Sequence, residues 1–152
     1  MRAPLHSEKL EVTSLFHDPF IVVIPAADKD TDTTAALSRY LKKQPFIFFN
    51  HEYAPFYYDK LMEICQRMGF VPDITHEANN VHSILRLVEN GAGASILPRT
   101  VKDHFPALNL QYLELVNIPV TTEVVLAHRP TQNTAITWFT KRYSDFFKQT
   151  SR

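Results

Sequence analysis

Two histidines of this chain stand where a zinc-binding motif could begin. His51 and His76 are each followed by a glutamate, as in His-Glu-x-x-His, which places two metal-binding histidines on one face of a helix. The second histidine is missing in both cases, because Pro55 and Asn80 stand at the position where it is required. The sequence therefore predicts no metal site of this type.

Other residues that could do chemistry lack the partners that they need. Ser95 does not lie in a Gly-x-Ser-x-Gly nucleophile elbow, because residue 97 is leucine. The glycines at 91 and 93 lack the third glycine of a dinucleotide-binding loop and lead into a strand rather than a helix. Cys65 lies on the apolar stripe of a predicted helix, where a small buried hydrophobe is expected rather than a nucleophile. We therefore predict that the chain is not an enzyme, with no catalytic residues and no cofactor.

The overall composition is that of a globular domain with balanced charge. The 152 residues are 45% hydrophobic, and 16 basic side chains are matched by 16 acidic ones. A nucleic-acid-binding domain usually carries a basic excess, so direct DNA binding by this chain is not favoured. Cys65 is the single cysteine and cannot form an internal disulfide, and the sequence shows no secretory signal and no membrane-spanning apolar run. We expect a cytoplasmic protein with no membrane partner.

Apolar runs and apolar stripes alternate along the chain, which predicts strands alternating with helices. The runs at 20–25 and 45–50 are typical of strands buried on both faces of a sheet. Further strands are predicted at 71–77, 94–98, 110–116 and 123–128, and residues 10–18 are expected to be extended. Helices are predicted at 35–43, at 55–68, between Asn80 and Gly91, at 100–105 and at 134–148. This order predicts an α/β fold whose sheet is parallel or mixed.

Ligands of such sheets usually bind beyond the carboxyl ends of the strands, close to the beginnings of helices. In this chain those positions are the loops at 50–57, 78–82 and 98–100. If the chain binds a ligand, the sequence therefore predicts that the binding site is formed by these three loops.

Five segments, in this order and spacing, resemble the effector-binding (substrate-binding) domain of LysR-type transcriptional regulators. They are Asp18 to Pro25, Pro45 to Phe49 with the helix that follows, Cys65-x-x-x-Gly69-Phe70-x-Pro72, Glu77 with Ile84 to Pro98, and Val124 to Arg129. The resemblance covers nearly the whole chain. It implies the two-lobed α/β fold of type 2 periplasmic binding proteins, with a small organic effector, expected to be a carboxylate, bound between the lobes of a bacterial regulator.

The resemblance also implies a division of the chain into lobes. Residues 26–122 would form a complete second lobe, and residues 1–25 and 123–152 would form the crossover strands and the remaining edge of the first lobe. The helix-turn-helix with which the family begins, and through which it binds DNA, has no counterpart here, so we expect a fragment truncated at its N-terminus. The expected partners are the effector and either a second copy of the chain or the full-length regulator.

Eight residues of the three loops are the expected ligand contacts. They are Tyr53, Phe56, Tyr57, Asn79, Val81, His82, Pro98 and Thr100. The backbone N–H groups of residues 80–82 would open a helix and favour an anion such as a carboxylate. An ordinary helix cap explains the same asparagines, His82 could be a surface residue, and Tyr57 could belong to the helix core. Arg99 is expected to be a solvated surface charge.

Other functions remain open from the sequence alone. The same fold serves solute-binding proteins of transport systems, and the chain could also act as a dimerisation module that competes with the intact regulator. The last predicted helix carries several large aromatic residues, more than residues 1–18 could cover. We therefore expect an exposed apolar patch on that helix or a partner chain that covers it.

Overall fold

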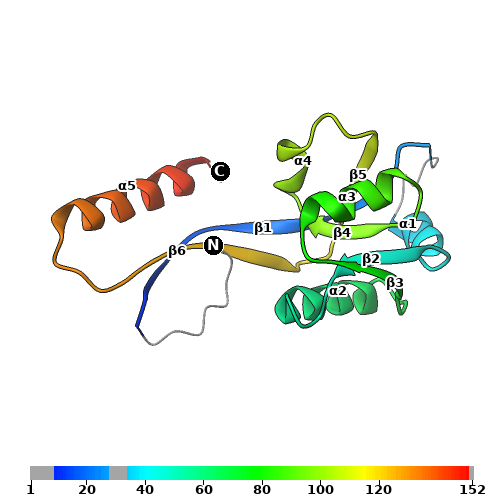
Figure 1. Ribbon diagram of the computed structural model, residues 1–152, viewed down its shortest axis with the longest axis horizontal. Coiled ribbons are helices and arrows are strands. Elements are labelled where there is room, and N and C mark those ends of the chain that lie inside the picture. The colour runs from blue at the N-terminus through cyan, green and yellow to red at the C-terminus, as the bar shows by residue number, and fades with distance from the viewer. Residues whose placement is uncertain (1–8, 28–33, 151–152) are drawn as a thin grey trace. The chain divides into compact units, whose positions relative to one another are not determined.

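The computed structural model describes residues 9–27 and 34–150 of the chain, and the structural statements below concern these residues. The chain divides into two compact units, drawn in Figure 1. Unit 1 is formed by Met1–Asp18 and Thr121–Arg152, and unit 2 is formed by Pro19–Val120. The strand β1 (Glu11–Pro25) contributes to both units, because the division falls within it.

Within its described residues, unit 2 contains two groups of hydrogen-bonded strands, with the orders β4-β1-β5 and β2-β3, which a single bridge joins into a mixed sheet. Its strands are the second half of β1, β2 (Pro45–Phe49), β3 (Asp73–Ala78), β4 (Ser95–Pro98) and β5 (Leu110–Glu114). β1 is antiparallel to β4 and β5, and Phe20 lies opposite Pro98. β2 and β3 are parallel, and a parallel bridge between Phe46 and Ala94 joins β2 to the beginning of β4. The mixed sheet expected from the sequence is therefore confirmed.

Helices cover both faces of this sheet. They are α1 (Thr34–Leu41), α2 (Pro55–Arg67), α3 (Val81–Glu89) and the short α4 (Val101–His104). Along the sheet, the chain moves in one direction from β2 to β3 and in the opposite direction from β3 to β4. Because both crossovers are right-handed, the helices that they contain, α2 and α3, lie on opposite faces of the sheet (Figure 1). The hydroxyl of Ser38 donates to the carbonyl oxygen of Met68 at 2.8 Å, which fixes α1 beside the end of α2.

The core of unit 2 is made by the strand runs and by one stripe on each long helix. The stripe of α2 consists of Leu61, Ile64 and Cys65, and that of α3 of Ile84, Leu85 and Val88; all are buried. Both stripes were expected from helical spacing in the sequence. Burial raises the pKa of the Cys65 thiol to about 12, so this residue is a buried hydrophobe at neutral pH, as expected.

The turn before β4 depends on a glycine at position 93. Its φ of +146° lies in a region that other residues rarely adopt. A Cβ atom added there would overlap the carbonyl oxygen of Pro45 and lie 2.9 Å from its carbonyl carbon. That carbonyl oxygen accepts a hydrogen bond from Ala94 N at 2.9 Å, and Ile47 N donates to Ala94 O at 2.9 Å. The absence of a side chain at Gly93 therefore allows the two backbones to meet and form the bridge between β2 and β4.

In unit 1, the first half of β1 pairs with β6 (Thr121–His128), and α5 (Thr134–Thr150) packs on this ribbon. The rings of Phe16 and Phe147 lie 5.2 Å apart, and Ser144 is buried. A polar groove lies between the ribbon and the helix, lined by Glu11, Thr13, His128, Thr137, Thr140, Lys141, Ser144 and Asp145. The helix therefore turns small and polar side chains toward β1 and β6.

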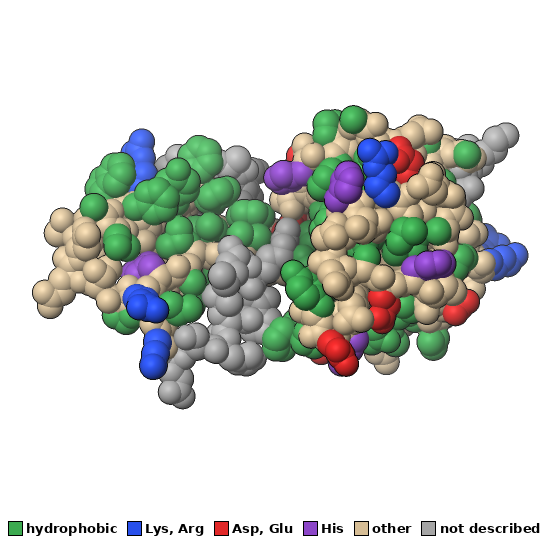
Figure 2. Space-filling model, viewed as in Figure 1, with side chains coloured by type: hydrophobic (Ala, Val, Ile, Leu, Met, Phe, Trp, Pro, Cys, Tyr) green, Lys and Arg blue, Asp and Glu red, His purple; other side chains and the backbone are tan. Residues whose placement is uncertain are grey.

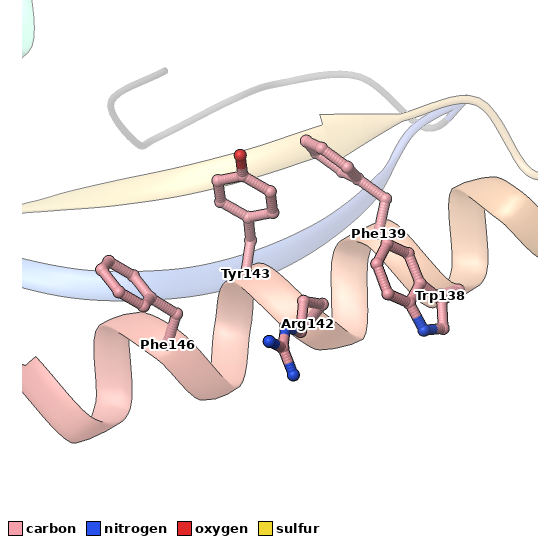
Figure 3. A pocket seen from close by; sticks show the side chains of 5 residues that line it. All are labelled: Trp138, Phe139, Arg142, Tyr143 and Phe146. Atoms are coloured by element: carbon pink, nitrogen blue, oxygen red, sulfur yellow. The ribbon is translucent and has the colours of Figure 1, made fainter.

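Four aromatic residues of α5, Trp138, Phe139, Tyr143 and Phe146, lie on another side of the helix and are exposed. We define the aromatic face of α5 as Trp138, Phe139, Arg142, Tyr143 and Phe146, which line a groove of about 530 Å³ (Figure 3). Apolar side chains gather over this helix in Figure 2. The exposed fraction is 66% for Trp138 and 58% for Phe146. The expected exposed apolar patch is thus confirmed for the described part of the helix.

The predicted helices and strands are confirmed with small shifts of their ends. One difference concerns β1, because Glu11–Pro25 form a single strand of 15 residues, where the sequence predicted an extended segment at 10–18 and a strand at 20–25. Residues 28–33, which precede α1, lie outside the described residues, and α1 begins at Thr34.

Gly93→Ala is expected to destabilise the chain severely. The new methyl group would overlap the Pro45 carbonyl and would also adopt an unfavourable φ, so the free energy of unfolding should fall by about 3 kcal/mol or more. Gly91→Ala is the matched control, because its φ of +79° is also unfavourable but no atom lies within 4 Å of the added Cβ. The control should lose only about 1–2 kcal/mol in urea unfolding. Equal losses for the two variants would contradict the steric argument.

Cys65 is expected to resist alkylation in the folded chain. Because its pKa is raised to about 12 and its side chain is buried, iodoacetamide at pH 8 should react at least about a hundredfold more slowly than with the chain unfolded in urea. Mass spectrometry of timed aliquots measures both rates. Complete labelling of the folded chain at the unfolded rate would show that the thiol is accessible.

Candidate ligand-binding site

Three parallel strands of unit 2 end at one edge of its sheet. β2 and β3 form a parallel pair, and the parallel bridge between Phe46 and Ala94 shows that β4 runs in the same direction as β2. The loops that leave these strands are 50–54, 79–80 and 99–100. The structure therefore brings the three loops predicted from the sequence to the same edge of one sheet, which is where open α/β sheets usually bind ligands.

The loop after β2 carries two exposed aromatic residues and leads to a third that is half-buried. Tyr53 and Phe56 are exposed, and α2 begins at Pro55, a residue suited to the first turn of a helix. The ring of Tyr57 packs edge-to-face on Phe49 at 5.2 Å and on Phe20 at 5.8 Å. Tyr57 therefore belongs in part to the core, while Tyr53 and Phe56 present apolar surface to a molecule at this edge.

The loop after β3 leads into a capped helix. Asn79 is exposed, and the Oδ1 atom of Asn80 accepts a hydrogen bond from Ser83 N at 2.9 Å. The N–H groups in the first turn of an α-helix have no acceptor within the helix. Because α3 begins at Val81, this applies to the N–H groups of Val81 and His82. The ordinary cap is present, and the two remaining amides can still receive an anion.

The side chains at the beginning of α3 differ in exposure. Val81 is half-buried and packs against the core, whereas His82 is exposed. The ring of His82 lies 5.8 Å from that of Phe105, just after α4. Both roles that the sequence left open for His82 are compatible with this position.

The end of β4 is more enclosed than the other two loops. Pro98 is buried opposite Phe20, and Thr100 is half-buried at the beginning of α4. Arg99 donates from its backbone N–H to the Pro19 carbonyl oxygen at 2.8 Å. Its guanidinium Nε lies 3.3 Å from Glu114 Oε1, and both side chains are more than half exposed. Arg99 is therefore a surface charge with an acidic partner, and Pro98 supports the edge from within.

One contact that the sequence did not predict ties the first of these loops to the end of β3. Asn50 follows β2 directly, and its Nδ2 atom donates to Glu77 Oε2, near the end of β3, at 2.7 Å. Its Oδ1 atom accepts from the N–H groups of Glu52 at 3.0 Å and Tyr53 at 3.3 Å. An asparagine that accepts from the amides two and three residues later is a recognisable turn signal. No sequence signal, however, pairs residue 50 with residue 77.

Glu89 and Ser95 are polar residues of unit 2 that lie outside the three loops. Hydrogen bonds from Asn109 N and from Arg86 lower the pKa of the Glu89 carboxyl, which links the end of α3 to the loop before β5. The hydroxyl of Ser95 is buried and has no hydrogen-bond partner within the described part of the chain. A fully buried hydroxyl cannot reach a substrate, so Ser95 is not placed to act as a nucleophile.

Two kinds of feature are absent from the described residues. Within residues 9–27 and 34–150, no three His, Cys, Asp or Glu side chains lie close enough to hold a metal ion. No helix in the same part of the chain combines the length and the apolar content that crossing a membrane requires.

Comparison with known sequences identifies regulators of transcription. The family model of the LysR substrate binding domain matches residues 1–147. The HTH-type transcriptional regulator AlsR of Bacillus subtilis is 26% identical over 129 residues, which are 85% of this chain and 42% of that protein. The uncharacterised HTH-type transcriptional regulator YnfL of Escherichia coli is 29% identical over 116 residues, which are 76% of this chain and 37% of that protein. The chain thus spans about two fifths of the length of these relatives.

Comparison with solved structures gives the fold. The effector-binding domain of BenM, solved with its effector benzoate, superposes with a TM-score of 0.74 at 17% identity, over 99% of this chain and 68% of that one. CbnR, a LysR family transcriptional regulator, superposes with a TM-score of 0.76 at 15% identity, over 96% of this chain and 50% of that one. Likeness at this identity shows the α/β, periplasmic-binding-protein-like fold of LysR effector-binding domains. With the family match over almost its whole length, the chain belongs to the LysR substrate-binding domain family, the sensing part of LysR-type regulators of transcription.

Proposed function

We propose that the chain senses a small organic acid at the edge where β2, β3 and β4 end. The observation that carries this proposal is that three loops converge at this edge of the sheet. The chain also belongs to the LysR substrate-binding domain family. The proposed contacts are Tyr53, Phe56, Tyr57, Asn79, Val81, His82 and Thr100, and Pro98, which the sequence also predicted, is buried behind them. The exposed aromatic residues provide apolar surface, and the first turn of α3 provides hydrogen-bond donors.

A carboxylate is the ligand group that the beginning of α3 favours. The amides of Val81 and His82 and the positive end of the helix dipole would both stabilise a negative charge. Benzoate, the effector named for BenM, is a carboxylate on an apolar ring. The combination of aromatic side chains and helix amides at this edge suits a molecule of that chemistry.

In a whole regulator, binding at this edge would act on DNA through a separate domain. The relatives are named HTH-type regulators, and the part that matches this chain is about two fifths of each. We propose that the effector shifts the conformational equilibrium of the sensing domain by binding one state more tightly than another. The proposed partners are the effector and a second copy or the full-length regulator in the cytoplasm, with DNA contacted only through a helix-turn-helix domain.

The division into lobes is also a proposal. Residues 26–122 would be the complete second lobe, and residues 1–25 and 123–152 the crossover strands and one edge of the first lobe. The aromatic face of α5 belongs to unit 1, where the described residues form only a two-stranded ribbon and one helix. In the longer relatives, further strands and helices of that lobe would cover such a face.

Two other functions are weaker. A solute-binding protein of a transport system has the same fold, but the curated relatives described above are regulators of transcription. A dimerisation or decoy role would use an exposed apolar surface, and the aromatic face of α5 is one. Co-purification with a full-length regulator would favour the decoy role.

Thermal unfolding in the presence of small acids tests the sensing proposal. A panel of benzoate, other aromatic acids, aliphatic acids and amino acids should contain one class that raises the midpoint. At a hundredfold excess over Kd, the rise should be about 5 °C or more and should saturate with concentration. Absence of any shift across the panel would contradict sensing by this chain alone.

Tyr53→Ser and Val71→Ser form a matched pair for locating the site. Both side chains are exposed, Tyr53 by 66% and Val71 by 82%, so neither change should alter the core. Only Tyr53 lies at the carboxyl ends of the strands, because Val71 precedes β3. The ligand-induced shift should therefore fall for Tyr53→Ser and remain for Val71→Ser. The reverse result would move the site to another part of unit 2.

The aromatic face of α5 is expected to bind a hydrophobic dye and to promote self-association. Replacing both Trp138 and Phe139 by Lys should lower dye fluorescence about twofold or more, because two exposed apolar side chains of the groove are lost. Val116→Lys, at an exposed apolar residue of unit 2, is the control and should leave most of the signal. A monodisperse monomer without dye binding would contradict an accessible patch.

A further inference from the structure

The asparagine at position 50 follows β2 directly and makes hydrogen bonds to two other segments at the edge of the proposed site. Its backbone N–H donates to Ala78 O at 3.2 Å, and its Nδ2 atom donates to Glu77 Oε2 at 2.7 Å. Its backbone carbonyl accepts from Tyr53 N at 3.1 Å and Ala54 N at 3.0 Å. One residue therefore connects the end of β2, the end of β3 and the loop that leads to α2.

The side chain uses both halves of its amide. The Oδ1 atom accepts from Glu52 N at 3.0 Å and from Tyr53 N at 3.3 Å, while the NH₂ group donates to the Glu77 carboxylate. Asparagine has this donor and acceptor on one short side chain, whereas ionised aspartate only accepts. An aspartate at position 50 would place two carboxylates at hydrogen-bond distance, and like charges that close disfavour each other.

An ordinary turn accounts for only part of this arrangement. The bonds from Oδ1 to the amides two and three residues later are those of a local asparagine turn. The bond from Nδ2 to Glu77 joins residues 27 positions apart and has no role in such a turn. It links the loop to the neighbouring strand, and so its effect on the site goes beyond closing the turn.

We propose that Asn50 is a positioning residue for the sensing site. Through Glu77 it holds the loop of residues 51–54 against the end of β3, and so sets where Tyr53 and the beginning of α2 lie. It also keeps one carboxylate, that of Glu77, fixed at this edge. The importance of this arrangement for ligand binding rests on the proposed function, whereas the positioning itself does not.

Reciprocal substitution tests the proposal without a ligand. In Asn50→Asp at pH 7, repulsion from Glu77 should displace the side chain and raise hydrogen exchange of the Glu52 and Tyr53 amides about tenfold. Adding Glu77→Gln should restore exchange to within about twofold or threefold, because the new amide at position 77 can donate to the new carboxylate at position 50, which reverses the hydrogen bond. Glu77→Gln alone should change little, since its oxygen can still accept from Asn50.

Asn133→Asp is the matched control for the charge change. The Oδ1 atom of Asn133 also accepts from a backbone N–H two residues later, that of Ala135, at 3.0 Å. Within the described part of the chain, no carboxylate accepts a hydrogen bond from the Nδ2 atom of Asn133. The midpoint of global unfolding should move little in all four variants, since these groups are exposed, and local exchange should respond only at position 50.

The outcomes separate the positioning role from the sensing function. Unchanged exchange in Asn50→Asp, or failure of Glu77→Gln to rescue it, would overturn the positioning role. A second arm measures the thermal shift by sodium benzoate in the same variants. If exchange behaves as expected while benzoate and the rest of the acid panel give no shift with the unsubstituted chain, the positioning stands and the sensing proposal fails.

Discussion

The close approach of two backbones at Gly93 is the constraint on which unit 2 depends. It lets β4 begin beside β2, and thereby joins the parallel pair β2–β3 to the antiparallel strands β4, β1 and β5. Without that bridge, the two groups of strands would have no common edge. The position of the three loops of the proposed site therefore follows from an atom that is absent, the Cβ of residue 93, rather than from any strong attraction.

Small polar contacts then refine an edge that the backbone has already assembled. The Asn80 cap orients the beginning of α3, and Asn50 ties the first loop to the second strand. Each contact is exposed, so each contributes little to the free energy of unfolding compared with the buried stripes of α2 and α3. Such contacts are suited to a sensing domain, because a ligand of moderate affinity can compete with them or add to them.

The sequence predicted most elements of the fold because their signals are local. The α3 stripe of Ile84, Leu85 and Val88 repeats at helical spacing, and the runs in β1 and β2 are continuous. The three loops of the site followed from the same order of elements. The bond between Asn50 and Glu77 could not be predicted, because it depends on the register of β2 and β3, which shifts after Phe46. The burial of Pro98 depends likewise on the residue opposite it in β1.

β1 contributes to two units, and its two halves have unequal support. Residues 20–25 are held by β4 and β5 and are almost entirely buried, whereas residues 11–18 pair with β6 alone within the described residues and are mostly accessible. Local opening free energies follow such differences in burial and pairing. The first half of the strand can fray while the second half stays intact, but loss of the second half removes the anchor of the first. Residues 11–18 are thus expected to exchange their amide hydrogens at a lower opening free energy than residues 20–25.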